Sequence, residues 1–375
     1  MREDWEIKNL EDACNIDYGT RVVKKKDAGT KYPVYGGGGA TFNVDDFNRE
    51  NSLVISRFAM SEQCTRFVQG KFFLNDSGLT LSSKNGDLLQ DFLNLQMLSL
   101  NQTIYDLGRG TAQRNLDVPK FRQLKIQYPK SIEEQKRIVS ILDKAFAAID
   151  KAKANAEKNL NNAKELFESY LWSYMSDKKW ERVKLQDICT KVEYGSSSKS
   201  LAIGKVPVLR MGNIQKGKFD WSDLVYTDNK EEIEKYTLEY NDILFNRTNS
   251  PELVGKTAIY KGEQPAIFAG YLIRIHRKKE LINADFLNFY LNSLVAFNYG
   301  KTVMSASINQ ANINGTKLKT YPIPLPPIET QEQIVNNLNL ILSQTISLSN
   351  TSQKKLDDLE ELKKSILHKA FNGEF

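Results

Sequence analysis

The sequence has few of the residues on which metal and acid/base sites usually depend. Its 375 residues include only three cysteines and two histidines. Because Cys14, Cys64 and Cys189 stand singly, neither a disulfide framework nor a CxxC metal clip is available. His276 and His368 are also far apart, so the commonest zinc and general-base arrangements lose support. We expect reduced, mostly buried thiols and no metal site.

Long apolar runs are missing as well. No stretch approaches the roughly eighteen apolar residues that span a bilayer, and the opening segment MREDWEIKNL is too charged for a secretory signal. We therefore expect a cytoplasmic protein with no membrane association. Hydrophobic residues make up 41% of the sequence and charged residues 26%, which is typical of a globular chain of two or three domains. The net charge of +6 favours a polyanionic partner.

Three glycine-containing motifs resemble nucleotide-binding loops but lack necessary residues. GNIQKGKF (212–219) has Phe219 where a phosphate loop needs Ser or Thr, and SPELVGKT (250–257) lacks the first glycine. YGGGGA (35–40) is flexible but does not have GxGxxG spacing. The Asn-Pro-Pro-aromatic motif of amino methyltransferases is also missing. We therefore expect no catalytic residue and no cofactor.

The sequence contains an internal repeat. KSIEEQKRIV (130–139) and PPIETQEQIV (326–335) share Ile, Glu, Gln, Ile and Val at the same relative positions. WEIKNLEDACNIDYGT (5–20) reappears as WERVKLQDICTKVEYGS (180–196), with Trp, Glu, Lys, Leu, Asp, Cys and Tyr-Gly in the same order. Similarity at so many positions indicates a tandem duplication.

Each half is predicted to begin with a mixed α/β domain. Short β-branched and aromatic runs separated by Gly, Asn, Asp and Pro are typical of strands and turns. Helix-like segments and a Gln-x-Asn motif then follow at matching points of the two halves. The strand examples are SLVISRF (52–58) and DILFNRT (242–248), the helices are 88–100 and 284–297, and the Gln-x-Asn motifs are 113–115 and 310–312.

Each half ends in a long amphipathic helix, predicted over about 132–175 and 328–372. The first helix has a heptad repeat at Leu142, Ile149, Ala156, Ala163 and Tyr170, offset from Phe146, Leu160, Phe167 and Tyr174. The second has apolar residues at Ile334, Leu338, Ile341, Leu348, Leu359, Leu362 and Ile366, and polar Thr345 and Ser352 interrupt them. This spacing is typical of a coiled-coil seam. At 1.5 Å per residue such a helix reaches roughly 65 Å, so it serves as a spacer.

The expected fold is α+β, with two similar mixed α/β domains separated by two long helices that pair as an antiparallel coiled coil. The chain would then be a pseudo-twofold tandem repeat with its two domains at opposite ends of one rod. The alternative, in which each helix packs against its own domain, remains open. The predicted divisions are a first domain (1–130), a first spacer helix (131–177), a second domain (178–326) and a second spacer helix (327–375).

The candidate function lies in basic and amide side chains near two matching strands. Arg57 and Arg247 follow similar strand-like runs, and Arg, Asn and Gln side chains are suited to reading base edges in the DNA major groove. The candidate DNA-contacting residues are Arg57, Ser61, Gln63, Arg66, Arg109, Arg114, Arg210, Asn213, Lys218, Asn246, Arg247, Thr248, Asn249, Lys256, Tyr271, Arg274 and Lys301. For any single one, a solvated or salt-bridged surface residue is an equal interpretation.

The repeated arrangement resembles the DNA-specificity subunit of type I restriction-modification systems. The segments SIEEQKRIVSILD and PIETQEQIVNNLN, the preceding YPIPLPP, and the strings VPVLRMGNIQKGKFDW, DILFNRTNSPELVGKTAIY and AGYLIRI carry this resemblance. It implies two target-recognition domains, each for one half of a bipartite DNA site, with helices that fix the spacer between them. The first half departs from the pattern, because it has KYPVYGGGG where the second has VPVLRMGNI. Base-contacting residues therefore transfer poorly to that half.

The resemblance also implies a non-catalytic subunit with protein partners. Two methyltransferase subunits would dock on the helices, and motor-nuclease subunits would join them. The residues expected in docking are Gln135, Ile138, Ile149, Phe167, Gln331, Ile334, Leu348 and Leu362. A stand-alone tandem DNA-binding regulator and a protein–protein scaffold are the alternatives. A chain truncated after Leu325 is expected to lose docking before either domain unfolds.

A length change in the first helix tests whether the helices set the spacer. Inserting four residues near Asn161 is expected to change the tolerated spacer, or to abolish binding, while both half-site preferences persist. Mapping of the recognised DNA sites measures this outcome. An unchanged target with an unchanged spacer would refute the ruler hypothesis.

Overall fold

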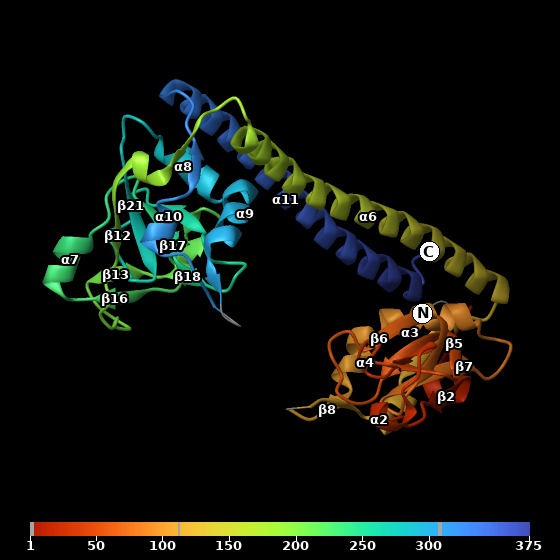
Figure 1. Cartoon of the computed structure of the whole chain (residues 1–375). Coiled ribbons are helices and arrows are strands. Elements are labelled where there is room, and N and C mark those ends of the chain that lie inside the picture. Colours follow the sequence, from red (N-terminus) through yellow and green to blue (C-terminus); the bar gives the residue numbers. More distant parts are fainter. Residues whose placement is uncertain (1–3, 112, 307–309) are drawn as a thin grey trace. The chain divides into compact units, whose positions relative to one another are not determined.

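The computed structural model describes residues 4–111, 113–306 and 310–375, and the chain divides into two compact units. Unit 1 comprises Met1–Glu157 and Gln353–Phe375, and unit 2 comprises Lys158–Ser352. Each unit contains an α/β domain together with part of both long helices (Figure 1). None of the described helices has both the length and the apolar character needed to cross a membrane.

Unit 1 is built on a six-stranded sheet with the order β2-β7-β5-β6-β3-β4. Neighbouring strands are antiparallel except for β3 and β6, which are parallel. The strands are β1 (Trp5–Asn9), β2 (Cys14–Tyr18), β3 (Tyr32–Tyr35), β4 (Asn43–Val44), β5 (Arg49–Ser56), β6 (Thr65–Leu74), β7 (Gly78–Ser83), β8 (Gly108–Arg109), β9 (Asn115–Leu116) and β10 (Lys125–Pro129). The short helices are α1 (Leu10–Ala13), α2 (Lys24–Asp27), α3 (Gln90–Ser99), α4 (Asn101–Asp106) and α5 (Val118–Arg122).

The core of unit 1 follows from strand alternation along β5. Successive side chains of a strand point to opposite faces, so Leu53 and Ile55 face the main core with α3, whereas Val54 packs with Phe72 in a second, smaller cluster. Burial of each such side chain contributes about 1.5 to 3 kcal/mol. The sheet therefore has an apolar cluster on both faces.

Unit 2 contains a four-stranded sheet, β12-β21-β17-β19, and a three-stranded sheet, β16-β13-β20. Its strands are β11 (Arg182–Lys184), β12 (Cys189–Tyr194), β13 (Val206–Leu209), β14 (Ile214–Gln215), β15 (Lys218–Phe219), β16 (Val225–Thr227), β17 (Ile243–Asn246), β18 (Thr248–Asn249), β19 (Thr257–Ile259), β20 (Ile267–Phe268), β21 (Leu272–Arg277), β22 (Ser305–Ala306), β23 (Ala311–Asn312) and β24 (Pro322–Pro324). Its short helices are α7 (Lys230–Tyr236), α8 (Ala284–Leu291), α9 (Leu294–Val303) and α10 (Gly315–Leu318).

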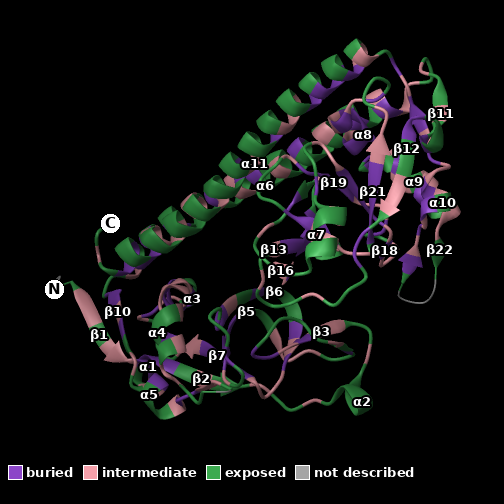
Figure 2. Cartoon of the chain, turned by 90° about the vertical axis from the view of Figure 1, so that its left-hand side faces the viewer, coloured by how far each residue is buried: buried purple, intermediate pink, exposed green. Residues whose placement is uncertain are grey.

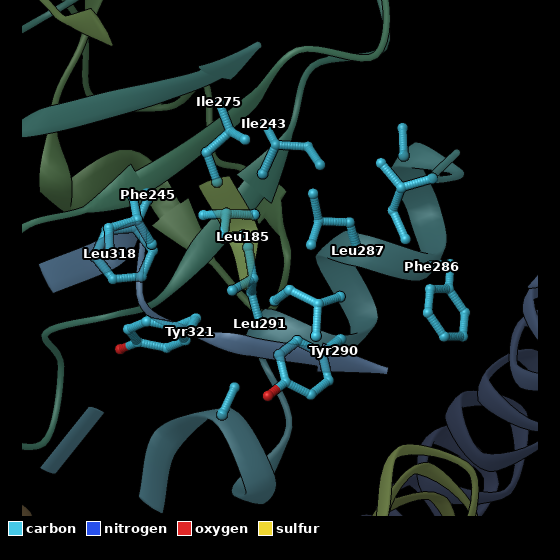
Figure 3. Packing of buried hydrophobic residues seen from close by; sticks show 14 of the residues in the cluster. Leu185, Ile243, Phe245, Ile275, Phe286, Leu287, Tyr290, Leu291, Leu318 and Tyr321 are labelled. Carbon is cyan, nitrogen blue, oxygen red and sulfur yellow. The ribbon is translucent and has the colours of Figure 1, made fainter. Parts of the chain in front are cut away.

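Strand β17 of unit 2, like β5 of unit 1, sends alternate side chains into two apolar clusters on opposite faces of its sheet. Ile243 and Phe245 join a large cluster with Leu287 and Tyr290 of α8, and Leu244 joins a second cluster on the opposite face. Figure 3 shows side chains of the large cluster gathered between the strands and α8. Figure 2 shows the buried residues concentrated in the strands, with exposed residues over much of the long helices. The two domains thus share one packing scheme.

The three cysteines are free and buried, as expected from their scattered positions. Burial raises the pKa of Cys14 to about 12 and that of Cys64 to about 11. Because the thiolate is the reactive form, these thiols are poor nucleophiles at neutral pH.

The two long helices are present as α6 (Ile132–Ser176) and α11 (Ile328–Phe371). Within unit 1, Lys363 of α11 lies 4.8 Å from the ring of Phe146, and Lys153 of α6 pairs with Glu360. Residue numbers rise along one helix as they fall along the other, so these segments are antiparallel (Figure 1).

The second half of α6 pairs with the first half of α11 inside unit 2. The amide of Asn337 donates to the hydroxyl of Tyr174 at 3.4 Å, and Leu171 and Met175 share a core cluster with Leu338. Each domain core therefore takes side chains from both helices. Pairing of the helices and packing on the domains, proposed as alternatives from the sequence, occur together.

The seam of α6 agrees with the predicted heptad until its last position. Leu142, Ile149, Ala156 and Ala163 are buried, but Tyr170 is 44% exposed and Leu171 is buried in its place. A straight α-helix drifts about 20° per heptad, so the inward face moves on by one residue over four repeats.

The prediction of the seam of α11 was wrong at its centre. Thr345 and Ser352 are buried, whereas Leu348 is 43% and Leu362 is 46% exposed. Thr345 and Ser352 follow Leu338 at successive seven-residue steps, so they occupy its heptad position. Position in the heptad, rather than the hydrophobicity of the side chain, therefore determines which residues are buried here. As a result, the middle of α11 buries the hydroxyl groups of Thr345 and Ser352.

A buried glutamine joins each long helix to its own domain. The amide nitrogen of Gln135 donates to the carbonyls of Asp87 and Pro129, at 2.7 and 2.8 Å, and its oxygen accepts from the N–H of Leu89 at 2.8 Å. Leu89 is the N-cap residue of α3. The Gln135 side chain, which lies in the first turn of α6, thereby accepts a hydrogen bond from the N-cap residue of α3.

Gln331 repeats this arrangement at the start of α11. Its amide nitrogen donates to the carbonyls of Leu281 and Pro326, at 2.9 and 2.8 Å, and its oxygen accepts from the N–H of Asn283, the N-cap residue of α8, at 2.8 Å. Both glutamines are completely buried. The repeated Gln therefore sets the direction in which each helix leaves its domain.

The truncation expected to spare both domains would in fact remove core residues from each. Beyond Leu325, α11 supplies Ile334 and Leu338 to the core of unit 2 and Leu367 and Phe371 to that of unit 1. Loss of several buried apolar side chains costs about 2 to 5 kcal/mol each. A chain ending at Leu325 is therefore expected to unfold rather than to lose docking alone.

Replacement of the buried glutamines tests their structural role. Gln135→Leu and Gln331→Leu leave two carbonyls and one N–H without partners in the interior, so each is expected to cost about 2 to 4 kcal/mol. Denaturant unfolding of the full chain measures the loss. Gln344→Leu, at an exposed position of α11, is the matched control and should change stability by less than about 0.5 kcal/mol. Equal stability of all three variants would contradict the role.

Candidate nucleic-acid interface

Arg57 and Arg247 occupy the same place in the two units. Arg57 follows β5, whose last residue Ser56 pairs with Gly78 of β7, and Tyr18 at the end of β2 pairs with the next residue, Leu79. In unit 2, Arg247 follows β17, Asn246 pairs with Leu272, and Tyr194 pairs with Ile273. The strand register is therefore the same, and it brings one Arg beside one Tyr in each unit.

Each arginine stacks on its tyrosine. The guanidinium carbon of Arg57 lies 5.0 Å from the ring centre of Tyr18, and that of Arg247 lies 4.8 Å from Tyr194. Stacking of this kind holds the planar guanidinium through its face and uses none of its N–H groups. We call Tyr18 with Arg57, and Tyr194 with Arg247, the Arg–Tyr corners.

The glycine after each tyrosine is required by close backbone approach. A Cβ added at Gly19 would lie 1.9 Å from the carbonyl oxygen of Asn75, and one at Gly195 would lie 2.2 Å from that of Phe268. No other residue fits at such distances. The repeated Tyr-Gly pair thus has a structural cause, and it was the signal in the sequence that could have identified these tyrosines as site residues.

The backbone of each arginine is fixed on both sides. The N–H of Arg57 donates to Ser77 at 2.8 Å, and its carbonyl accepts from Leu116 at 2.9 Å. The N–H of Arg247 donates to Tyr271 at 3.1 Å, and its carbonyl accepts from Ile313 at 2.9 Å. Leu116 and Ile313 come directly after the Asn of the two Gln-x-Asn motifs. The residue after this motif therefore holds the arginine backbone in both units.

In unit 1 the corner borders a groove of about 500 Å³, whose lining includes Arg57, Arg109 and Gln113. Arg109 is largely exposed, and its Nε donates to the buried carboxylate of Asp117 at 2.6 Å. Asp117 also caps α5 by accepting from the N–H of Lys120 at 3.3 Å. The groove thus presents cationic and amide groups, and Asp117 orients one of its arginines.

The remaining candidates of unit 1 are at or near the surface. Ser61 and Gln63 are exposed, and Arg66 donates to the carbonyls of Gly37 and Gln63, at 3.2 Å in each case. Arg114 lies 4.5 Å from the ring of Tyr105 and donates to the carbonyl of Asp106 at 3.4 Å. Backbone carbonyls and an aromatic ring thus orient these two arginines.

Several candidates of unit 2 also lie at its surface. Tyr271, Lys218 and Lys301 are exposed, and Lys301 lies 4.5 Å from the ring of Phe297. Arg210 is half-buried and pairs with Asp223 at 3.1 Å. Lys256 and Asn249 are half-buried, and the Asn249 side chain accepts from the N–H of Ser250 at 2.9 Å.

Four candidates of unit 2 are buried, which corrects the expectation that they read bases. Asn213 accepts from the N–H of Arg210 at 2.8 Å and stabilises a loop. The Thr248 hydroxyl accepts from Asn312 at 2.7 Å. Asn246 donates to the carbonyl of Leu253 at 3.4 Å. The sequence could not separate these from surface amides, because they have the same chemistry.

Arg274 is the fourth, and it forms the centre of a buried ion network. Its guanidinium binds Glu193, with Nε to Oε2 at 3.0 Å, and Asp242 at 3.1 Å. His276 also contacts the Glu193 carboxylate, at 3.0 Å. Partial burial alone would raise the pKa of Glu193, but the hydrogen bonds from Arg274 and His276 outweigh it and lower that pKa to about 2.

Most residues expected in partner docking lie inside the units. Gln135 and Gln331 have the bonds described above, Ile138, Ile149 and Ile334 are buried, and Phe167 is partly buried 6.3 Å from Phe289. This corrects the expectation that these six side chains face a partner. Leu348 and Leu362 are the two exposed members of the set.

The phosphate-loop-like segment 212–219 is a β-hairpin. β14 and β15 pair around a turn at Lys216 and Gly217, whose φ angles are 50° and 80°. A phosphate loop instead leads from a strand into a helix. Across residues 4–111, 113–306 and 310–375, no group of three or more His, Cys, Asp or Glu side chains is placed to hold a metal ion.

Comparison with known proteins gives a consistent result. The family model described as "Type I restriction modification DNA specificity domain" matches residues 2–161 and 177–358. The chain is 35% identical over 197 residues to a putative type I restriction enzyme MjaX specificity subunit of Methanocaldococcus jannaschii, covering 51% of this chain and 45% of that protein. It is 27% identical over 289 residues to the type I restriction enzyme EcoKI specificity subunit of Escherichia coli strain K12, covering 72% and 62%. The matches span less than two thirds of these relatives.

Two solved structures have a similar fold. One comes from work on complex assembly and conformational transition of the type I R-M system, with a TM-score of 0.76 at 16% identity, covering 99% of this chain and 98% of that chain. The other is the HsdS subunit from Thermoanaerobacter tengcongensis, with a TM-score of 0.58 at 16% identity, covering 100% and 98%. At these identities the likeness concerns the fold alone.

The lowered pKa of Glu193 predicts acid sensitivity of unit 2. A carboxylate with a pKa of about 2 in the folded state and 4.5 otherwise contributes stability that is fully present above pH 4.5 and lost as the pH falls toward 2. The contribution is about 3 kcal/mol. Unfolding of the full chain between pH 7 and pH 2 should show this loss. Glu193→Gln should be less stable at pH 7 and should have a flatter pH profile; a profile parallel to the wild type would contradict the network's role.

Proposed function

The chain belongs to the type I restriction modification DNA specificity family, and we propose that it is the sequence-specific DNA-binding subunit of a type I restriction-modification complex. The observation that carries this proposal is the occurrence of the same Arg–Tyr corner in two domains of one chain. A pair of equivalent cationic corners suits a bipartite DNA target, because each domain meets one duplex segment. A DNA substrate also implies a cytoplasmic location.

The proposed division of labour follows the tandem repeat. Residues 1–130 and 178–326 are the two recognition domains, and each reads one half of the target. Residues 131–177 and 327–375 are the spacer helices, which set the unspecified gap between the half-sites. The buried glutamines support this role, because a spacer sets a distance only if its direction from the domain is fixed.

The proposed DNA contacts are the candidates that the structure leaves at least partly exposed. Positive and amide groups of this kind supply phosphate affinity and base discrimination. The set is Arg57, Ser61, Gln63, Arg66, Arg109 and Arg114 in unit 1, with Arg210, Lys218, Arg247, Asn249, Lys256, Tyr271 and Lys301 in unit 2.

We propose that catalysis resides in partner subunits. Two methyltransferase subunits and motor-nuclease subunits would supply the chemistry, and this chain would supply recognition and docking. Apolar side chains exposed on the long helices support a docking role, because the buried core of a protein–protein interface is rich in such groups. They are Ile141, Leu166, Tyr170 and Trp172 on α6, with Leu340, Ile346, Leu348 and Leu362 on α11.

Charge substitution on the exposed helix surface tests docking. Leu348→Asp is expected to weaken co-purification with the methyltransferase subunit by about tenfold or more, because a carboxylate would be desolvated at the interface. Ser343→Asp, at another exposed position of α11, is the matched control. Equal co-purification of both variants would remove Leu348 from the proposed interface.

Methylome sequencing of a host that expresses the chain with its methyltransferase tests the function as a whole. A new split motif, with two short specified blocks around an unspecified gap, is expected. Omission of this chain should abolish the motif. A continuous motif, or none when both proteins are present, would favour a regulator or a scaffold instead.

A further inference from the structure

The Arg–Tyr corners are more alike than the surfaces around them. The stacking distances, the strand register and the four backbone bonds to the arginines agree between the units. Next to Arg57 lies Phe58, whose ring also contacts the guanidinium at 4.5 Å. Next to Arg247 lies Thr248, which instead begins strand β18 and pairs with Asn312 of β23. The two corners are thus similar, but the residues next to them differ between the units.

The similarity of the two corners, in surroundings that differ, indicates which part of a DNA duplex they contact. Two domains that read different base sequences need different side chains at the base edges. A cation held in the same way in both domains must instead meet a feature that both half-sites contain. The phosphodiester backbone is the feature that every duplex segment shares, and contacts to it position a protein without reading sequence.

The state of the guanidinium groups agrees with an anionic ligand. Within the part of the chain that the structure describes, Arg57 has no hydrogen-bond acceptor and no carboxylate partner for its guanidinium. Arg247 has one weak bond, from Nη1 to the carbonyl of Gly270 at 3.3 Å. A guanidinium remains charged at all physiological pH values, and its fork of donors matches phosphate oxygens. By contrast, the buried Arg274 is neutralised by two carboxylates.

We infer that Arg57 and Arg247 form a matched pair of phosphate clamps, one for each half-site, and that Tyr18 and Tyr194 are their positioning residues. The inference rests on the proposed function and assigns the contact within it. It replaces the expectation that these two arginines read bases. Sequence discrimination is left to the unshared neighbours, such as Gln63 in unit 1 and Tyr271 in unit 2.

The test uses the full chain assembled with its methyltransferase subunits and a duplex containing the motif found by methylome sequencing. Affinity is measured over a salt series, on this target and on duplexes with each specified base pair changed in turn. Arg57→Ala and Arg247→Ala should each weaken binding about tenfold on every duplex alike. The slope of log K against log salt should fall by about 0.9, the value for one lost phosphate contact.

Three further variants separate clamping from a structural effect. Arg57→Lys keeps the charge but not the planar fork, so it should restore the salt slope and part of the affinity. Tyr18→Leu should weaken binding on all duplexes, because it removes one of the two rings that orient Arg57 and leaves only that of Phe58. Lys125→Ala removes an exposed charge from β10 in the same unit and should change affinity less than twofold. Unchanged unfolding midpoints establish that the variants are folded.

Each outcome decides the inference. A uniform loss with a reduced salt slope supports it. A loss confined to one base pair would make the arginine a base reader, and unchanged affinity would make the corner purely structural; either overturns it. If the wild-type complex shows no sequence-selective binding, the proposed function itself fails, whereas selective wild-type binding with unaffected variants refutes the clamps alone.

Discussion

The rest of the structure depends on a buried glutamine repeated at the start of each long helix. Gln135 and Gln331 each satisfy two carbonyls and the N–H of a helix N-cap residue in their own domain. Hydrogen bonds of this kind are directional, and an unpaired buried polar group is costly. A helix anchored in this way leaves its domain in one direction, which a hydrophobic contact alone would specify less sharply.

The helices also complete the domain cores. The end of α11 brings Leu367 and Phe371 into unit 1, and the end of α6 brings Leu171 and Met175 into unit 2. Each core therefore contains residues from the helix that follows the other domain. Removal of the second helix would therefore take buried residues from both cores.

The Arg–Tyr corners place cationic groups where the domain sheets end. Their register comes from strand pairing and their rigidity from bonds to the segments after the Gln-x-Asn motifs. Side chains around such corners can differ without disturbing them, because the bonds that hold each arginine join backbone groups, whatever side chains the bonded residues carry. A duplicated scaffold can thus present two different surfaces around two similar corners.

The tandem repeat, the two long helices and the buried cysteines were all predictable from the sequence. Long periodic patterns and repeats of many residues identify helices and duplications even where the secondary structure of a single short segment is ambiguous. The predicted arginines at 57 and 247 do occupy matching positions, because they follow matching strands. The assignment of surface and interior was weaker, as Arg274, Asn213, Asn246 and Thr248 show.

The sequence by itself determined the repeat, the element types and the approximate helix ends, since these depend on local spacing. Only the tertiary structure decided which face of each helix is buried. Thr345 is inside and Leu348 outside, because heptad phase is set by contacts along the whole helix. The structure also decided which polar side chains are available to a ligand. Arg247 and Arg274 have the same side chain, but the fold places the carboxylates of Glu193 and Asp242 beside Arg274. Both carboxylates are far from Arg274 in the sequence, so local sequence patterns do not reveal this pairing.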